Sequence, residues 1–204
     1  MTSEPIRDPA ADHLLTPDNS ALVIIDYQPT QVQSIRSMST DALIDNIVRV
    51  ARVADLYDLP IILSTVNVHT GRNGPTTSEL VEVLPKGIEP YDRTQINAWE
   101  DVEFRAAIAA TGRTKLLMTA LWTEACLTFP TLDALREGYD VYPVVDAVGG
   151  TSLEAHRTAL ARVQQAGARL TSWVQIISEL QRDWARSATS SRFANILFGG
   201  PKAA

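Results

Sequence analysis

Cys126 is the residue of this sequence best suited to act as a nucleophile. It is the only cysteine of the chain, and it follows an apolar stretch at 116–118 and a short turn. We expect it to begin a helix that runs to Arg136. The start of a helix presents unpaired backbone N–H groups and the positive end of the helix dipole, which favour the reactive thiolate. The alternative is a buried apolar filler, because free cysteines are among the most buried residues.

Two charged residues could support such a thiol. Asp26 follows the apolar run at 21–25, and a carboxylate there could take the thiol proton and return it to a leaving group. Otherwise it caps a helix or closes the strand through a salt bridge. Arg93, if it lies beside both groups, would lower the pKa of each by favouring the charged form. It would act as an electrostatic partner that stays protonated; in isolation, an arginine in a loop is more often a surface charge.

Other kinds of site have weaker support. His13, His69 and His156 are scattered, and no two share a metal-ligand spacing on one element. The chain has no Walker A motif, no G-x-G-x-x-G and no G-x-S-x-G. The stretch 149–151 (GGT) is too short a signal for a phosphate loop. We therefore expect neither a metal nor a cofactor, and we expect Thr123 and Glu124 to cap or brace the turn before the cysteine.

Apolar runs alternate with amphipathic stretches along the chain, which predicts one α/β domain with a parallel sheet of about five or six strands between helices, a three-layer α/β/α, Rossmann-like arrangement. Helices are expected at 41–56, 78–84, 101–111, 126–136, 153–166 and 174–185. Strands are expected at 21–25, 60–68, 89–93, 115–118, 140–146 and 168–173.

This order of elements explains how distant residues could form one site. Sites in parallel sheets lie beyond the carboxyl ends of the strands. Asp26, Arg93 and Cys126 each follow an expected strand, so they can converge at one edge of the sheet. Lys115 begins its strand, so we expect it at the opposite edge and exclude it from the site.

Composition bounds the class of protein. The chain has 204 residues and a net charge of -6, with no run of Lys or Arg, which argues against a nucleic-acid partner. No segment approaches the roughly 20 apolar residues of a membrane span, and the first twenty residues lack a signal-peptide pattern. A single cysteine suits a reducing compartment, so we expect a cytoplasmic protein. We divide the chain into an N-terminal arm (1–19), a main domain (20–187) and a C-terminal tail (188–204).

Three stretches together resemble a known family: ALVIIDYQ, DRTQINAWED and GRTKLLMTALWTEACLTFPTLDALREGYDVYPVVDAVGGTS. They are similar to the isochorismatase-like cysteine hydrolases, in particular the YcaC-like branch, and the resemblance covers roughly residues 15 to 188. It implies the isochorismatase-like fold and a catalytic Asp, basic residue and Cys, which match Asp26, Arg93 and Cys126. The basic residue is commonly Lys, and Arg in many YcaC-like members.

The resemblance also implies details of the pocket. A cis peptide precedes the cysteine in the family, and here it would be Leu121–Trp122. The backbone N–H groups of Trp122 and Cys126 would form the oxyanion hole, and Asn97, Trp122 and Phe129 would line the substrate pocket. The metal-binding loop of related nicotinamidases corresponds to TVNVHTGRNGP, which has one His and no acid, so no metal is expected there.

The implied function is hydrolysis of a small amide or related C–N compound through a thioester on Cys126. Two alternatives remain: a vinyl-ether hydrolase of the isochorismatase type with Asp26 as general acid, and a non-catalytic relic. The expected partners are a small-molecule substrate and further copies of the chain, with no nucleic acid and no membrane. The resemblance implies a closed oligomer, such as an octamer of two stacked rings. Apolar residues between Trp173 and Phe198 could cover such contacts, or could equally be core.

Overall fold

Five parallel strands form the centre of the fold in this computed structural model, which describes residues 7–199. They are paired in the order β3-β2-β1-β4-β5, every pair parallel. This confirms the predicted α/β class. The strands are β1 (Ser20–Ile25), β2 (Ile61–Val66), β3 (Tyr91–Arg93), β4 (Lys115–Ala120) and β5 (Asp140–Pro143).

The segment 168–173, predicted as a sixth strand, is not a full strand. Its chain runs beside β5, where the Thr171 N–H donates to the Pro143 carbonyl at 3.0 Å and the Val145 N–H donates to the Thr171 carbonyl at 2.8 Å. Only an isolated bridge between Val144 and Thr171 results. Pro143 has no N–H to donate and so interrupts the ladder.

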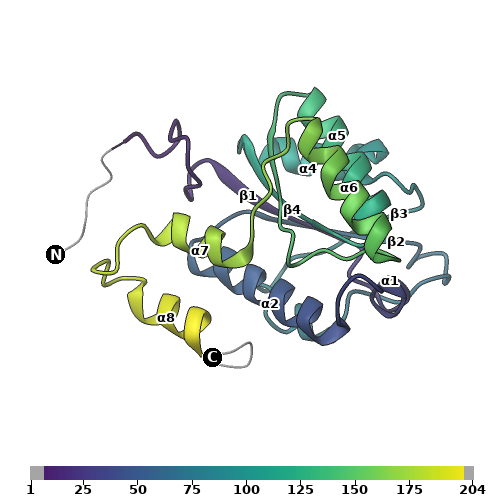
Figure 1. Cartoon of the computed structure of the whole chain (residues 1–204), viewed down its shortest axis with the longest axis horizontal. Coiled ribbons are helices and arrows are strands. Elements are labelled where there is room, and N and C mark those ends of the chain that lie inside the picture. Colours follow the sequence, from purple (N-terminus) through teal and green to yellow (C-terminus); the bar gives the residue numbers. More distant parts are fainter. Residues whose placement is uncertain (1–6, 200–204) are drawn as a thin grey trace.

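Helices cover both faces of the sheet (Figure 1). α2 and α7 cover one face, with α1 and α8 beside them, while α4, α5 and α6 lie on the other side. A short 3₁₀ turn (Ala98–Glu100) precedes α4, and a π-helical turn (Thr123–Leu127) precedes α5. The helices are α1 (Pro29–Ser34), α2 (Thr40–Leu56), α3 (Ser78–Val81), α4 (Val102–Ala110), α5 (Thr128–Arg136), α6 (Leu153–Gln165), α7 (Trp173–Gln181) and α8 (Ser190–Phe198).

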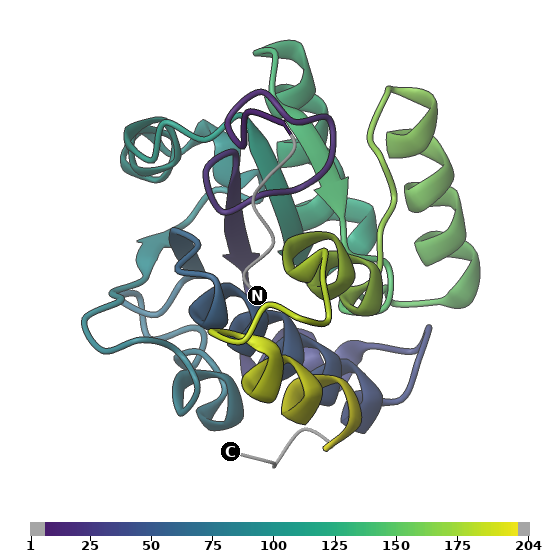
Figure 2. The same cartoon turned by 90° about the vertical axis from the view of Figure 1, so that its left-hand side faces the viewer.

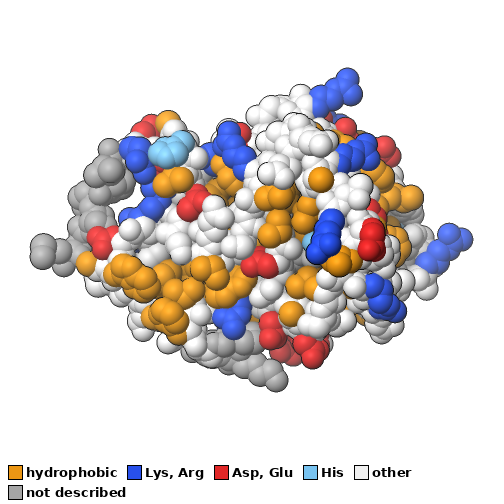
Figure 3. Space-filling model, viewed as in Figure 1, with side chains coloured by type: hydrophobic (Ala, Val, Ile, Leu, Met, Phe, Trp, Pro, Cys, Tyr) orange, Lys and Arg blue, Asp and Glu red, His pale blue; other side chains and the backbone are white. Residues whose placement is uncertain are grey.

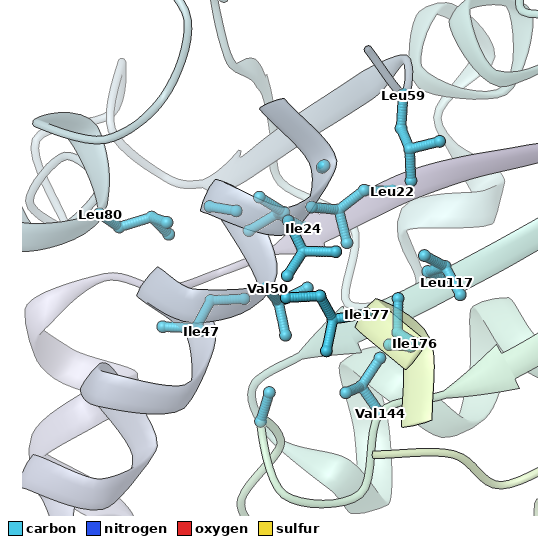
Figure 4. Packing of buried hydrophobic residues seen from close by; sticks show 14 of the residues in the cluster. Leu22, Ile24, Ile47, Val50, Leu59, Leu80, Leu117, Val144, Ile176 and Ile177 are labelled. Atoms are coloured by element: carbon cyan, nitrogen blue, oxygen red, sulfur yellow. The ribbon is translucent and has the colours of Figure 1, made fainter. Parts of the chain in front are cut away.

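β1 divides the core into two halves. Its side chains alternate between the faces, as strand geometry requires, and all six residues are buried. Leu22 and Ile24 point to the face covered by α2 and α7, where they pack with residues such as Val50 and Ile177 (Figure 4). Ala21, Val23 and Ile25 point to the opposite face. A strand buried on both faces places whatever follows it deep in the molecule.

Both ends of the chain fold onto this core more fully than the sequence predicted. The tail contains α8, whose Phe193 and Ile196 are buried and whose Ile196 carbonyl accepts a hydrogen bond from Arg49 of α2. The described part of the N-terminal arm lies at the amino ends of the strands (Figure 2). There Lys115 donates from Nζ to the carbonyls of Asp12 and Leu14. Residues 1–6 of the arm and 200–204 of the tail lie outside the described residues.

Lys115 therefore sits at the edge of the sheet opposite the carboxyl ends, as its position at the start of a strand predicted. No helix within residues 7–199 is both long and apolar enough to span a membrane.

Candidate active site

Asp26 and Arg93 form a buried ion pair at the carboxyl edge of the sheet. Asp26 directly follows β1 and has a φ of 63°, a left-handed conformation that Asp tolerates better than most residues. Arg93 is the last residue of β3, two strands away. Arg93 Nη2 donates to Asp26 Oδ2 at 2.8 Å, and both side chains are fully buried. Arg93 Nη1 also donates to the Gln95 carbonyl at 2.6 Å.

The pairing determines the charge state of the two residues. Burial raises the pKa of Asp26, while Arg93 and an interaction with Cys126 act in the opposite direction. A neutral Asp26 would leave the buried guanidinium unpaired, which is costly, so the carboxylate is ionised in the resting site. Its second oxygen, Oδ1, is buried and accepts no hydrogen bond of ordinary geometry from the described residues. That oxygen is available to accept a proton.

Cys126 lies in the π-helical turn Thr123–Leu127, which we call the nucleophile turn, and is 7% exposed. Its interaction with Asp26 joins it to the ion pair. The three residues that the sequence singled out are therefore brought together, although 67 positions separate Asp26 from Arg93.

The expected protonation state of Cys126 is wrong, however. Burial raises the pKa of the thiol, and the charge of Asp26 and its hydrogen bond with the thiol raise it further. Arg93 and the Trp122 N–H lower the pKa, as predicted, but they do not outweigh burial and the nearby carboxylate. The resting nucleophile is thus a neutral thiol beside a carboxylate base.

The peptide bond Leu121–Trp122 is cis, at the position expected from the resemblance. The Trp122 backbone N–H interacts with the Cys126 sulfur and lowers the pKa of the thiol. The Trp122 indole Nε1 donates to Ser34 Oγ at 2.5 Å and so fixes the half-buried ring against α1. The assignment of the Trp122 and Cys126 N–H groups as an oxyanion hole remains a prediction.

The other predicted pocket residues lie on neighbouring elements. The Asn97 side chain donates to Asp133 Oδ2 at 2.8 Å and accepts from the Trp99 N–H at 3.1 Å. Both ends of this amide are therefore occupied, and Asn97 braces the 3₁₀ turn against α5. Phe129 is a half-buried residue of α5, three positions after Cys126. The roles of Asn97 and Phe129 in binding substrate remain predictions.

The three histidines lie on different elements of the fold. His69 contacts Asp92 through Nδ1, His13 lies beside Asp12, and His156 belongs to α6. Among residues 7–199, no group of three or more His, Cys, Asp or Glu side chains is arranged to hold a metal ion.

Two anchors of the loop after β2 escaped the sequence analysis. The fully buried Gln28 side chain donates to the carbonyls of Val66 and Gly74 at 3.1 and 2.7 Å and accepts from the Val66 N–H at 2.8 Å. Asp92 accepts from the N–H groups of Val68 and His69. Gln28 carried a signal that could have been noticed, since an amide so close to the end of a buried strand needs partners.

Comparisons of the sequence with known proteins all point to the same family. Residues 20–175 match the isochorismatase domain model. The sequence is 36% identical over 172 residues to "Probable hydrolase YcaC" of Escherichia coli K12, covering 83% of this chain and 81% of that protein. It is 31% identical over 172 residues to mouse isochorismatase domain-containing protein 2A, covering 83% and 78% of the two chains.

Solved structures agree with this result. A structure of YcaC from Pseudomonas aeruginosa with hexane-2,5-diol and covalent acrylamide has a TM-score of 0.81 and 33% identity, covering 92% of this chain and 96% of that one. The Escherichia coli YcaC structure, described as an octameric hydrolase of unknown specificity, has a TM-score of 0.81 and 30% identity, covering 97% and 98%. The chain therefore belongs to the isochorismatase domain family, as a YcaC-like hydrolase.

Proposed function

We propose that this chain is a cysteine hydrolase of small amides or related C–N compounds, with Cys126 as nucleophile, Asp26 as general base and acid, and Arg93 as electrostatic partner. The observation that carries the proposal is the fully buried Asp26–Arg93 ion pair, with the Cys126 thiol interacting with Asp26. A buried carboxylate with a raised pKa is a stronger base than an exposed one, so it suits proton transfer near neutral pH.

The first half of the reaction uses these groups in turn. Asp26 takes the proton of the Cys126 thiol as the sulfur attacks the substrate carbonyl carbon. The carbonyl oxygen becomes an oxyanion that the N–H groups of Trp122 and Cys126 stabilise. Asp26 then protonates the nitrogen as the C–N bond breaks, and the amine leaves a thioester on the sulfur.

The second half restores the enzyme. Water attacks the thioester carbonyl while Asp26 accepts one of its protons, and the C–S bond breaks to give a carboxylic acid and the thiolate. The proton on Asp26 returns to the sulfur, which regenerates the starting site. Arg93 keeps its charge throughout and stabilises the carboxylate whenever it is ionised.

Two further points support this proposal. The Pseudomonas aeruginosa relative is described with covalent acrylamide, and acrylamide is an electrophile that alkylates thiols. In this chain Cys126 is the only cysteine, so it is the only residue that could supply a thiol nucleophile. A vinyl-ether hydrolase would need the Asp26 acid but no such thiol.

A screen of small amides with detection of an acyl adduct by mass spectrometry tests the proposal. We expect an adduct on wild-type Cys126, and loss of turnover in Cys126→Ala and Cys126→Ser with the circular dichroism spectrum unchanged. Because the chain has a single cysteine, pre-treatment with iodoacetamide modifies only this thiol. Turnover that survives complete alkylation, or that is unchanged in Cys126→Ala, would reject the thioester scheme and favour the vinyl-ether reaction.

We also propose that the chain forms a homo-oligomer with its own copies. The Escherichia coli relative is described as octameric. Apolar side chains gather over the α7 and α8 side of the surface (Figure 3). Along this part of the chain, Val174 of α7, Trp184 between the helices and Phe198 of α8 are 42%, 70% and 73% exposed. Single exposed apolar residues are common, but a cluster of this kind usually marks an interface.

A further inference from the structure

Thr123 links the nucleophile turn to the rest of the fold through every polar atom it has. It is fully buried. Its N–H donates to the Gly149 carbonyl at 2.9 Å, and its carbonyl accepts from Thr128 Oγ1 at 2.7 Å. Its hydroxyl lies 2.9 Å from Nδ1 of His156 on α6. A buried hydroxyl that loses its partner keeps the cost of its desolvation, so the contact with His156 has energetic weight.

The position of Thr123 makes this contact relevant to catalysis. It follows Trp122, whose N–H interacts with the Cys126 sulfur, and it precedes the cysteine by three residues. The N–H groups of Ala125 and Leu127 both donate to the Trp122 carbonyl, at 3.2 and 3.1 Å. The backbone of the turn is therefore hydrogen-bonded internally to Trp122, and Thr123 is one of the residues through which the turn is held from outside.

We propose that His156 is a positioning residue that acts through Thr123 to hold the nucleophile and the Trp122 N–H in register. This rests on the function proposed above. His156 itself touches neither the sulfur nor the proposed oxyanion site in the described contacts. His156 holds Thr123, which lies between Trp122 and Cys126 in the sequence. Loss of His156 should therefore slow attack on a carbonyl more than it changes the accessibility of the thiol.

The surroundings of His156 suit this role. Its N–H donates to the Ser152 carbonyl at 3.1 Å, and Ser152 caps α6, so the residue sits on the fixed first turn of the helix. Burial lowers the pKa of His156; Glu124 opposes this effect and Arg157 adds to it. A neutral imidazole has one donor and one acceptor nitrogen, and either form of Nδ1 can pair with a hydroxyl.

A second set of contacts keeps α6 close to the turn. Glu124 Oε1 accepts from the Thr151 N–H at 2.9 Å and the Thr151 hydroxyl at 2.6 Å. Gly150 comes directly before Thr151. A Cβ added at Gly150 would lie 2.6 Å from Glu124 Oε2 and 3.0 Å from the His156 Cβ. The chain at Gly150 thus packs closely against both Glu124 and His156, so a displacement of His156 would be passed on to the turn.

Two probes of Cys126 separate positioning from thiol reactivity. p-Nitrophenyl acetate acylates the thiol through a tetrahedral oxyanion, which the backbone N–H groups must meet, whereas iodoacetamide alkylates it with no charge developing on a carbonyl oxygen. The ratio of the acetylation rate to the alkylation rate therefore reports the register of the turn. Removing a whole oxyanion donor costs about 10² to 10³ in rate, so displacement of one should cost about tenfold.

Variants at both ends of the contact give the test. We expect Thr123→Val and His156→Leu each to lower the ratio about tenfold, with the double variant no worse than either single one because they remove the same contact. Thr123→Ser keeps the hydroxyl, and His156→Asn places an amide near the Nδ1 position, so both should restore the ratio to within about threefold. Thr158→Val, which removes an exposed hydroxyl from the same helix, is the matched control.

Each outcome decides the matter. If the midpoint of thermal unfolding falls in Thr123→Val and His156→Leu while the ratio is unchanged, His156 has only a structural role and the inference is wrong. Additive losses in the double variant would also contradict it. If wild-type protein gives no acetyl-Cys126 at all, the proposed cysteine chemistry fails, and the inference fails with it.

Discussion

Replacing the base with its amide should make the Cys126 thiol more reactive and the enzyme less active. In Asp26→Asn, the carboxylate whose charge and hydrogen bond raise the thiol pKa is gone, while Arg93, which lowers that pKa, remains. The buried guanidinium then lacks its partner, and a thiolate at Cys126 can supply the missing negative charge. The thiol pKa must therefore fall.

The expected change in the alkylation rate follows from the shift in the thiol pKa. A nearby charge shifts a pKa by about 1 to 3 units, which would raise the thiolate fraction at pH 7 by about 10- to 1000-fold. Thiolates of lower pKa are less nucleophilic, with a Brønsted coefficient of about 0.4 to 0.5. The net gain in alkylation by iodoacetamide is thus about 3- to 60-fold. Amide turnover should fall by about 10²- to 10⁴-fold, because no general acid remains to protonate the leaving nitrogen.

The assay follows the rate of iodoacetamide adduct formation on Cys126 between pH 5 and 10 by mass spectrometry, beside turnover of an amide found in the screen. Asp55→Asn makes the same chemical change at a half-exposed ion pair with Arg192 on α2 and α8, and should change neither rate. Loss of one member of a buried ion pair can cost about 3 to 5 kcal/mol, so folding is checked by thermal unfolding. A folded Asp26→Asn that alkylates more slowly than wild type across this pH range would refute the charge assignment.

Two further predictions concern stability and assembly. Hydrogen bonds from His69, Val68 and Thr65 overcome partial burial and lower the pKa of Asp92 to about 2; its contribution to stability is therefore present at neutral pH and lost as pH falls from about 4 to about 2. The free energy of unfolding, measured with urea, should fall on the Asp92→Asn substitution by about 2 kcal/mol more at pH 7 than at pH 2. Equal losses at the two pH values would contradict this. Light scattering should give a multiple of the 22.3 kDa monomer, reduced by Trp184→Ser together with Phe198→Ser; a monomeric wild type would contradict assembly.

The alternation of apolar runs and amphipathic stretches was enough to predict the sheet and most of its helices. It was also enough to place Asp26, Arg93 and Cys126 at one edge, because each follows a strand and parallel strands end together. Their assigned roles remain predictions. The continuous apolar run at 21–25 is typical of a central parallel strand, and β1 is buried on both faces.

Burial is also the reason why the thiol state was predicted wrongly. The argument from a helix start counted the N–H groups and the dipole near Cys126 but not the desolvation of a residue that is 7% exposed. The C-terminal helix α8 was missed although Phe193, Ile196 and Leu197 recur at helical spacing. It follows the last expected helix, and it packs against α2. The anchoring bonds of Gln28 and Asp92 depend on loops that have no periodicity at all.

The two anchors of the loop after β2 have a consequence for how this scaffold could change its substrate. Gln28 hydrogen-bonds to the chain at Val66 and again at Gly74, so one side chain holds both ends of this loop and the residues between them could be exchanged. The sequence at the tip of this loop could be changed while its two ends stay in place. Asp26, two positions before Gln28, would stay in place as well. Grafting the corresponding tip from a relative onto this chain therefore tests whether this loop sets selectivity while Asp26 stays in place.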